Sequence, residues 1–492
     1  MASTLPDPHP GAGPTPADGA ASAARAAERA GVEAHGIDHI PESERRGRPR
    51  ELFSVWAAAN VNYLSLVVGG ALVLMGLSLW QALVVIVVGN LFWLLTGLLA
   101  VPGPVAGAPS EVVTRALYGV RGNRVNNAVT GWLISVCYFA LNLAAAATAA
   151  FSLVDRAGLP VTTGVKAAVV VLIAAVTLAI GVYGHAAIVR LYPTITLVLS
   201  AVFAVVGVAV LRHTDFGYTP GQPPTGTDLW ATVAAGTALI ASGPLSYTTS
   251  ADFSRYLPRA TPAKAVAGWT ALGGFVPSVL VCGIGACAAT AVDMNDPESS
   301  LQTLLPGWFR PVFLLALVLG TVALNALTSY SAGLALQAVG LRIRRTLSVL
   351  VDGAVAVSLT LYALLVSDFL DAVGDVLQLT VLLLGPGTAV YATDILLRRG
   401  RYDGPALADE SPGGPFWYTG GVNRAGALAL VAGVTASALS VDSVYTGPVA
   451  AALGGADLAL PAGMAVASGT YALLSARLRQ AAARAGRLPE QP

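Results

Sequence analysis

Long apolar segments separated by short polar connections make up most of the chain. From residue 52 onward, these segments are each near the roughly 20 residues that an α-helix needs to cross a bilayer. The twelve predicted helices cover residues 53–78, 80–101, 128–153, 166–184, 191–211, 229–250, 266–291, 311–340, 348–367, 372–396, 424–441 and 458–476. The pattern therefore predicts an all-α, polytopic membrane protein with twelve transmembrane helices.

The two ends of the chain have a different composition. Residues 1–50 are rich in Ala, Pro, Gly and charged residues and contain no apolar run. We expect this segment to be a disordered tail, because it is too polar for a signal peptide and cannot bury enough apolar surface to fold. Residues 477–492 are expected to form a second tail, which leaves one membrane domain at residues 51–476.

The composition narrows the possible functions. Only 11% of the 492 residues are charged, against about 25% in soluble domains, which excludes a soluble enzyme. The net charge is +1, which excludes binding to nucleic acid through bulk charge. The three cysteines lie in apolar runs without a neighbouring histidine, and we expect no metal site and no cofactor.

Basic residues indicate the orientation of the predicted helices. If the N-terminus is cytoplasmic, 24 of the 28 Lys and Arg residues lie on the cytoplasmic side. The four on the other side are Arg156, Lys166, Arg212 and Arg310. Because cytoplasmic loops carry an excess of basic residues, both termini are predicted to be cytoplasmic. High Ala, Arg and Gly usage is typical of a GC-rich bacterium, so we expect the plasma membrane of a bacterium.

Two of the predicted helices contain residues that interrupt a helix. The first contains Gly69-Gly70, preceded by Asn62 and Ser65. Transporters bind substrates where discontinuous helices meet, at corresponding positions of two inverted repeats. Kinks that serve only helix packing are the alternative, since Gly and Pro are common in transmembrane helices.

The second interruption lies five helices later. The sixth predicted helix contains Gly243-Pro244, followed by Ser246 and Tyr247, and proline removes a backbone donor from a helix. Five helices is the repeat spacing of the leucine-transporter (LeuT) type of inverted repeat. This spacing predicts one repeat at residues 53–211, a second at residues 229–396, and two extra helices at residues 424–476.

The polar residues of the predicted helices favour a neutral ligand. No Asp, Glu, Lys or Arg lies near the middle of the first eight helices, so a pocket would consist of amides, hydroxyls and aromatic rings. Tyr138 and Asn142 are four residues apart and share one helical face; they are either a pocket face or helix-packing residues. Asp252 precedes Arg255 by three residues, a spacing that fits either a coupling site or a structural ion pair.

The chain resembles the nucleobase–cation symporters of the first class, and within them the purine–cytosine permease branch. The resemblance covers residues 37–476. The segments that carry it are VWAAANVNYLSLVVGGALVLMGLSLW at 55–80, Gly89-Asn90, residues 108–119, residues 183–188, ADFSRY at 251–256, NALTSYS at 325–331, and Asp394 before Arg398-Arg399.

This resemblance implies a LeuT-type fold and cation-driven uptake of nucleobases or related heterocycles. The family pairs an aromatic residue with an Asn or Gln in the third helix, which are Tyr138 and Asn142 here. Where the family often has Trp in the sixth helix, this chain has Ser246-Tyr247-Thr248. With the breaks included, the predicted substrate-binding residues are Asn62, Ser65, Gly69, Tyr138, Asn142, Ser246, Tyr247, Asn325, Thr328 and Ser329. The predicted coupling or gating residues are Gly243, Pro244, Asp252 and Arg255.

The coupling ion is predicted from one departure from the family. Sodium-coupled members have hydroxyl residues just before the Asn of the eighth helix, where this chain has Ala323 and Leu324. A hard cation prefers oxygen ligands, so we expect proton coupling. The protein is predicted to be a monomeric importer of a neutral nucleobase of the cytosine or purine type. The alternative is a carrier of another small solute on the same fold, such as allantoin, a hydantoin, a thiamine-like vitamin or an amino acid.

Two other classes of membrane protein fit the sequence less well. A membrane-embedded enzyme would need a nucleophile–base pair or metal ligands at membrane depth, and the sequence shows neither. A channel would need rings of charge or a carbonyl filter. The protein is therefore not expected to be an enzyme, and its expected partners are the small heterocycle and the lipid bilayer.

Overall fold

The chain folds into a bundle of helices, as the apolar segments predict. The structure is a computed structural model that describes residues 32–365, 369–442 and 445–484. Within these residues the elements are helices, with two isolated bridges, and a helix covers each of the twelve predicted segments. By length and apolarity, eight of these helices can cross a membrane, and the bent pair α2 and α3 adds a ninth. The all-α membrane fold is thus confirmed, while the count of twelve spans stays a prediction.

The helices follow the order of the two predicted repeats. The first repeat contains α2 (Glu51–Asn60), α3 (Tyr63–Leu74), α4 (Leu79–Asn90), α5 (Trp93–Ala100), α8 (Arg115–Asn126), the π-helix η2 (Asn127–Leu133), α9 (Ile134–Arg156), α10 (Thr163–Tyr183) and α11 (His185–Leu211). The second contains α12 (Gly226–Leu245), α13 (Ala251–Ser254), α14 (Ala263–Ala289), α16 (Arg310–Ala338), α17 (Arg345–Leu365) and α18 (Phe369–Arg398). The extra helices are α20 (Arg424–Ser440) and α22 (Ala459–Arg484).

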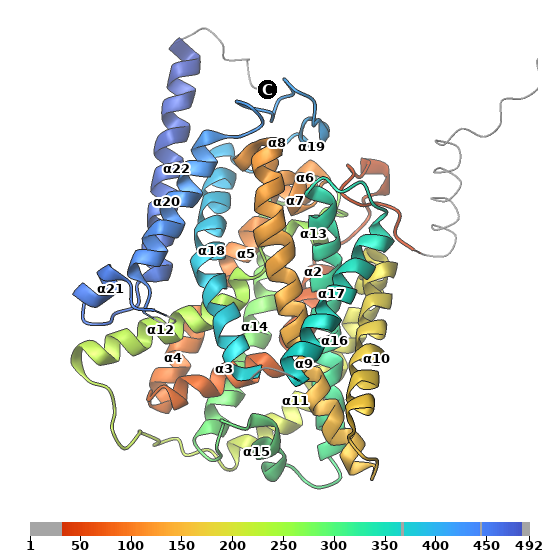
Figure 1. Ribbon diagram of the computed structural model, residues 1–492, viewed down its shortest axis with the longest axis vertical. Helices are drawn as coiled ribbons and strands as arrows, with labels where there is room; N and C mark the ends of the chain where they lie inside the picture. Colours follow the sequence, from red (N-terminus) through yellow and green to blue (C-terminus); the bar gives the residue numbers. More distant parts are fainter. Residues whose placement is uncertain (1–31, 366–368, 443–444, 485–492) are drawn as a thin grey trace, which may run out of the picture.

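Short helices connect the long ones and mark the two ends of the bundle. They are η1 (Glu42–Glu44), α6 (Pro102–Ala106), α7 (Ser110–Val113), α15 (Pro297–Leu304), α19 (Gly404–Ala408) and α21 (Pro448–Ala452). Helices α6, α7 and α19 gather at one end, here called the α7 end, and α15 lies at the opposite end (Figure 1). Naming the two ends after α7 and α15 describes positions in the bundle without assuming which side of the membrane each end faces.

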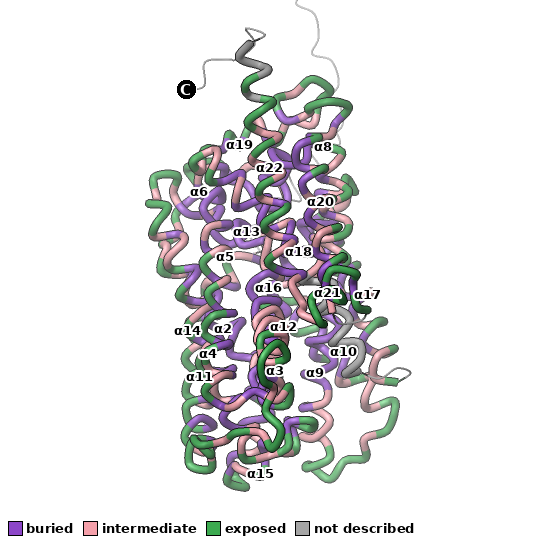
Figure 2. The backbone as a smooth tube through the Cα atoms, turned by 90° about the vertical axis from the view of Figure 1, so that its left-hand side faces the viewer, coloured by how far each residue is buried: buried purple, intermediate pink, exposed green. Residues whose placement is uncertain are grey.

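The interior of the bundle is formed by helices that carry small and apolar side chains on all sides. Helices α9 and α16 pack against each other and are the most buried of the membrane-length helices, whereas α10 and α11 are mostly exposed. Figure 2 shows this gradient from the buried centre to the exposed rim. Exposed apolar residues such as Leu172 and Leu197 fit a lipid-facing surface, because lipid tails are as apolar as leucine.

The break in the first helix is real, but it lies upstream of the predicted glycine pair. Helices α2 and α3 meet at an angle of 59°, and Val61 and Asn62 between them have non-helical backbone angles. Asn62 repairs the break with its own side chain. Its amide donates to the Ala59 carbonyl at 2.7 Å and its side-chain oxygen accepts from the Ser65 backbone N–H at 3.0 Å. Backbone groups left unpaired by the break therefore find partners without water.

Gly69 and Gly70 lie inside α3 and allow α14 to come close. A Cβ atom at Gly69 would overlap the backbone of Cys282 on α14, and Gly285 faces Leu66 in the same way. Small residues let helix backbones approach in a membrane. The structure thus shows a role in helix packing for Gly69 and Gly70, which was the alternative to a break at this pair.

The predicted disordered tail is too long at its C-terminal end. Residues 1–31 lie outside the described residues, but residues 32–50 are ordered against the α7 end. Ile40 and Arg45 are buried, and the Arg45 guanidinium donates to the carbonyl groups of Ile40 and Pro104. The polar composition misled the prediction, because these residues are held by specific polar contacts rather than by an apolar face. At the other end, α22 extends to Arg484, past the predicted boundary at residue 476.

Candidate substrate pocket

The second predicted break separates α12 from α13. Helix α12 ends at Leu245 directly after Pro244, and the chain turns before α13 begins at Ala251. Thr96 on α5 supports the break, since its hydroxyl donates to the Pro244 carbonyl at 2.9 Å. The Ser250 hydroxyl in turn donates to the Thr96 carbonyl at 2.8 Å. As at the first break, side chains satisfy the backbone groups that the interrupted helix exposes.

A cavity of about 90 Å³ lies between the two breaks. It is bounded by residues of α2 and α3 on one side, α12 and its following turn on another, and α9, α14 and α16. Its polar lining residues are Asn60, Asn62, Ser65, Asn90, Ser135, Tyr138, Asn142, Ser242, Ser246, Tyr247, Thr249, Ser278, Thr328 and Ser331. None of its described lining residues is Asp, Glu, Lys, Arg or His. The cavity is therefore uncharged, with hydrogen-bonding groups set in a largely apolar wall.

Most of the predicted site residues line this cavity. Those that do are Asn62, Ser65, Tyr138, Asn142, Gly243, Pro244, Ser246, Tyr247 and Thr328. Those that lie outside the lining are Gly69, Asp252, Arg255, Asn325 and Ser329. The structure thus brings together residues from four separate segments of the sequence, and it places the predicted coupling residues Asp252 and Arg255 outside the cavity lining.

Asn325 is placed behind the cavity, where it orients Asn142. The Asn142 amide donates to the Asn325 side-chain oxygen at 3.2 Å, and the Asn325 amide donates to the Phe139 carbonyl at 3.0 Å. Both residues are buried. The pair links α9 to α16 and fixes which way the Asn142 amide faces. Ser329, on the same helix as Asn325, points away from the cavity toward Gly181 of α10.

An aromatic cluster forms one wall of the cavity. The Tyr247 ring lies 4.9 Å from the Trp56 ring, edge to face, and is stacked at 5.6 Å on the Trp93 ring. Phe253 packs edge to face on Trp56 at 5.5 Å. Such arrangements hold aromatic rings in defined orientations. Tyr247 therefore presents an aromatic ring to the cavity, and the Trp56 and Trp93 rings hold it in place.

The sequence analysis missed several polar lining residues. Asn60 accepts a hydrogen bond from the Ser278 hydroxyl of α14 at 3.0 Å, and Asn90 lines the cavity from α4. Their signal was available, because amides inside apolar segments are costly unless they are paired or functional. Ser278, in contrast, resembles any other small residue of an apolar helix.

Asp252 and Arg255 lie on the α7 side of the cavity and have different partners. Asp252 accepts hydrogen bonds from the Ser110 backbone N–H at 2.8 Å and the Ser331 hydroxyl at 2.7 Å. Arg255 pairs instead with Glu33 of the N-terminal segment, at 3.0 Å. The spacing of Asp252 and Arg255 allowed an ion pair between them, but these two described residues do not form one in the structure.

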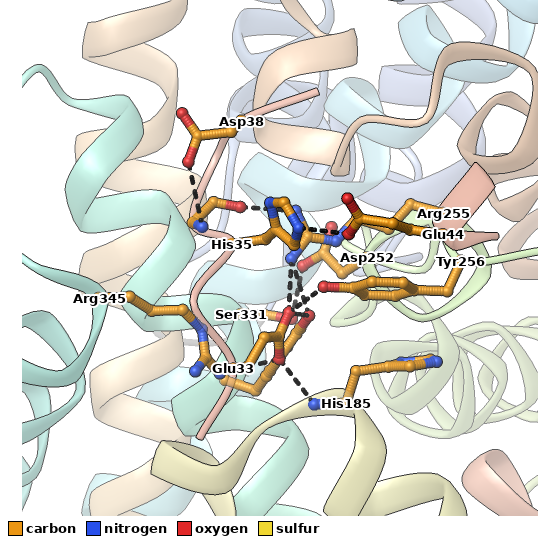
Figure 3. A network of polar contacts seen from close by, with 12 residues as sticks. Glu33, His35, Asp38, Glu44, His185, Asp252, Arg255, Tyr256, Ser331 and Arg345 are labelled. Atoms are coloured by element: carbon orange, nitrogen blue, oxygen red, sulfur yellow. Dashed lines mark hydrogen bonds and ion pairs between the residues drawn. The ribbon is translucent and has the colours of Figure 1, made fainter. Parts of the chain in front are cut away.

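Glu33 is the centre of a buried polar network at the α7 end (Figure 3). Its carboxylate lies 3.5 Å from Arg345 and accepts from the hydroxyls of Tyr330 at 2.9 Å and Tyr256 at 2.5 Å. Burial alone would raise the pKa of Glu33, but Arg345 and Arg255 lower it to about 2. The carboxylate is therefore charged at neutral pH and holds the N-terminal segment to α13, α16 and α17.

The described residues offer no set of metal ligands. No three His, Cys, Asp or Glu side chains among them come together in a way that could hold a metal ion. What the site offers is a neutral, hydrogen-bonding cavity between two broken helices, with the buried charged residues Glu33, Asp252 and Arg255 on its α7 side.

Two comparisons of sequence relate the chain to known proteins. Residues 39–463 match the family described as permease for cytosine/purines, uracil, thiamine, allantoin. The chain is also 28% identical over 464 residues to YxlA, a candidate purine-cytosine permease of Bacillus subtilis (strain 168), covering 92% of this chain and 98% of the relative.

Solved structures share the fold. Mhp1, a nucleobase-cation-symport-1 family transporter, in a closed conformation with bromovinylhydantoin bound, is similar with a TM-score of 0.69 and 18% identity, covering 93% of this chain and 97% of that chain. A Na⁺-coupled sialic acid symporter has a TM-score of 0.59 and 11% identity, covering 92% and 95%. The fold and the family match agree with the resemblance drawn from the motifs. The chain belongs to the family of permeases for cytosine/purines, uracil, thiamine and allantoin, and it is a transporter, not an enzyme.

Proposed function

We propose that the protein imports a neutral, planar heterocycle of the nucleobase type, together with protons, across the plasma membrane of a bacterium. The uncharged cavity between the two helix breaks is the observation that carries this proposal. A nucleobase offers flat faces and both donors and acceptors at its edges. The Tyr138 and Tyr247 rings can cover such a face, and the Asn142 and Asn62 amides can both donate and accept.

The lining also argues against the alternative of a charged solute. A carboxylate or ammonium group in this cavity would meet no opposite charge among the described lining residues, and an unpaired charge away from water is costly. Mhp1 with bromovinylhydantoin bound shares the fold, which supports a heterocyclic ligand of this size. A hydantoin or allantoin therefore remains the alternative within the same chemical class.

Competitive uptake tests the substrate class. We expect cells that express the protein to accumulate labelled cytosine, hypoxanthine, uracil or allantoin above the level of cells with an empty vector. An excess of unlabelled heterocycle is expected to compete, and an excess of a neutral amino acid is not. Competition by the amino acid alone would contradict the proposal.

We assign the α7 end to the cytoplasm. The charge split supports this assignment, because Arg115, Arg121, Arg259 and Arg344 belong to the connections that gather there, whereas the basic residues of the other side are few. Reporter fusions test it. We expect fusions after Arg259 or Arg344 to report a cytoplasmic location and fusions after Asp215 or Asp296 an external one. The reversed pattern would contradict the assigned orientation.

Proton coupling is supported by the groups around Ala323 and Leu324 on α16. Neither side chain carries an oxygen, and the Ala323 carbonyl already accepts a hydrogen bond from the Tyr192 hydroxyl at 2.6 Å. A cation such as sodium would have to compete for that oxygen. Uptake is therefore expected to fall with an uncoupler, to rise as the external pH falls, and to be unchanged when choline replaces sodium. Strict sodium dependence would contradict proton coupling.

A further inference from the structure

A second, smaller cavity of about 30 Å³ lies between the substrate cavity and the α7 end. Its lining includes Glu111 of α7, Thr249 of the turn after α12, and Tyr391 of α18. Thr249 lines both cavities. The two cavities are thus neighbours, and the lining of the second includes a carboxyl group that no step of the proposed function uses.

The Glu111 carboxyl is buried without a donor. Glu111 is 2% exposed, and neither of its carboxyl oxygens accepts a hydrogen bond from any described group. A buried carboxylate in this state would be an uncompensated charge, which costs several kcal/mol in proteins. Glu111 avoids that cost if its carboxyl carries a proton.

Asp252 provides the partner for such a proton. The side chains of Glu111 and Asp252 lie within hydrogen-bonding reach of each other, and two carboxyl groups can share a hydrogen bond only when one of them is protonated. Asp252 is fully buried and already accepts from the Ser110 N–H and the Ser331 hydroxyl. These contacts favour the charged form of Asp252 and leave the proton on Glu111.

The other ionisable groups around the pair do not neutralise its charge in place of this proton. Arg255 lies near both carboxyls and favours their charged forms, but its guanidinium is bonded to Glu33, Gly36 and Tyr330. Two tyrosines, Tyr118 and Tyr391, line the second cavity together with Glu111. Burial raises the pKa of Glu111 and of Asp252, and the charge of Asp252 raises that of Glu111 further.

We propose that Glu111 and Asp252 together form the proton-binding site of the transport cycle. This inference rests on the proton coupling proposed above. Glu111 belongs to the first predicted repeat and Asp252 to the second, so a movement of one repeat against the other changes their separation. While the α7 end is closed, the pair stays dry and keeps its proton.

Opening of the α7 end releases the proton. Water would then reach both carboxyls, and their pKa values would return toward about 4, the ordinary value for Asp and Glu. At a cytoplasmic pH near 7 the proton leaves. Protonation thus favours the closed α7 end, which is the differential binding that lets an ion bias a conformational equilibrium. Thr249, which lines both cavities, places the second cavity next to the substrate cavity.

Transport driven by a pH gradient tests the site. The purified full-length protein is reconstituted in liposomes with an inward gradient of about two pH units, using whichever of cytosine, hypoxanthine, uracil or allantoin the wild type accumulates best. With one proton per substrate, such a gradient supports accumulation of up to about a hundredfold. We expect Glu111→Gln, which mimics a permanently protonated carboxyl, to lower the accumulation ratio to about one. Exchange of labelled for unlabelled substrate at equal pH is expected to persist, because Glu111 does not line the substrate cavity, but to be slower than in the wild type, because a neutral residue 111 favours the closed α7 end.

Glu298→Gln is the matched control. Glu298 is also a carboxyl that is largely buried and whose pKa burial raises, but it lies on α15 at the opposite end of the bundle. This variant is expected to accumulate substrate as the wild type does. Gradient-driven accumulation by Glu111→Gln at the wild-type level would overturn the site alone. Absence of such accumulation in the wild type, with a sodium gradient driving it instead, would overturn proton coupling and the site together.

A measurement without substrate covers the case in which Glu111→Gln loses gradient-driven transport for a structural reason. A carboxyl whose folded pKa is raised contributes stability at low pH that is lost as the pH rises through that folded value. The melting temperature of the wild type is therefore expected to fall more steeply than that of Glu111→Gln or Asp252→Asn as the pH rises above the ordinary pKa range of carboxyl groups. Equal slopes in the wild type and in whichever variant folds would overturn the site.

Discussion

Replacing Glu33 by alanine is expected to lower the free energy of unfolding by about 3–5 kcal/mol, the usual cost of removing one partner of a buried ion pair. The change leaves Arg255 and Arg345, whose side chains are 0% and 3% exposed, without their carboxylate. It also removes the acceptor for the hydroxyls of Tyr256 and Tyr330. Thermal unfolding of the purified full-length protein in detergent measures the effect.

The matched control for this prediction lies five residues away. Asp38 is an exposed carboxylate of the same segment, and its hydrogen bond is a local one of 3.4 Å to the Gly36 backbone N–H. Asp38→Ala is expected to change stability by less than about 0.5 kcal/mol. Equal melting temperatures for Glu33→Ala and Asp38→Ala would show that the N-terminal segment does not stabilise the α7 end.

The pH dependence of the Glu33 contribution has a definite sign. Because its folded pKa is lowered from 4.5 to about 2, the stability that Glu33 contributes is present above about pH 4.5 and is lost as the pH falls toward 2. The difference between wild type and Glu33→Ala should therefore be constant between about pH 6 and pH 9. This sets Glu33 apart from Glu111, whose contribution to stability is expected to fall as the pH rises, because its folded pKa is raised.

The helices were predictable because their signal is local. Each membrane helix requires a run of apolar residues of nearly fixed length, so the twelve segments could be located from the sequence alone. The position of the first break was harder to predict from the sequence. Glycine is a poor helix former in water, which drew the prediction to Gly69-Gly70, whereas in this protein the pair serves the approach of α14. Asn62, whose side chain caps α3, carried the better signal.

The charged networks could not be predicted in the same way. Glu33 and Arg255 are 222 residues apart, and Ser110 and Asp252 are 142 residues apart. No periodicity relates residues at such distances, and a short polar segment such as residues 32–50 has the composition of a disordered tail. Glu111 was overlooked for a similar reason, since an acidic residue in a connecting loop is usually solvated. Only its burial shows that it is not.

The residues of the substrate pocket were predictable in part. Tyr138 and Asn142 were predicted from their spacing on one helical face, and both line the cavity. Asn325 was predicted to contact the substrate, but it holds Asn142 instead. Sequence spacing identifies residues that share a face of one helix, whereas the depth of a residue behind that face depends on how a second helix packs on it.

Replacing Asn142 by alanine is expected to lower the apparent substrate affinity by about 5- to 150-fold. The Asn142 amide is buried and lines the cavity beside Tyr138, so its removal leaves polar groups of the substrate unpaired, at a cost of about 1–3 kcal/mol. Concentration-dependent uptake of the labelled heterocycle measures the change, with the amount of protein in the membrane determined by immunoblot.

Four further variants separate a substrate contact from a packing role. Thr148→Ala is a control on the same helix, because Thr148 lies outside the cavity and its hydroxyl donates to the Ala145 carbonyl of its own helix; uptake is expected to be unchanged. Asn325→Ala is expected to weaken uptake less than Asn142→Ala, because it frees the Asn142 amide without removing it. Tyr138→Phe is expected to be milder than Tyr138→Ala, because the ring face survives. Wild-type uptake by Asn142→Ala would place the substrate elsewhere in the protein, and the same loss in all variants would indicate damaged helix packing rather than a lost contact.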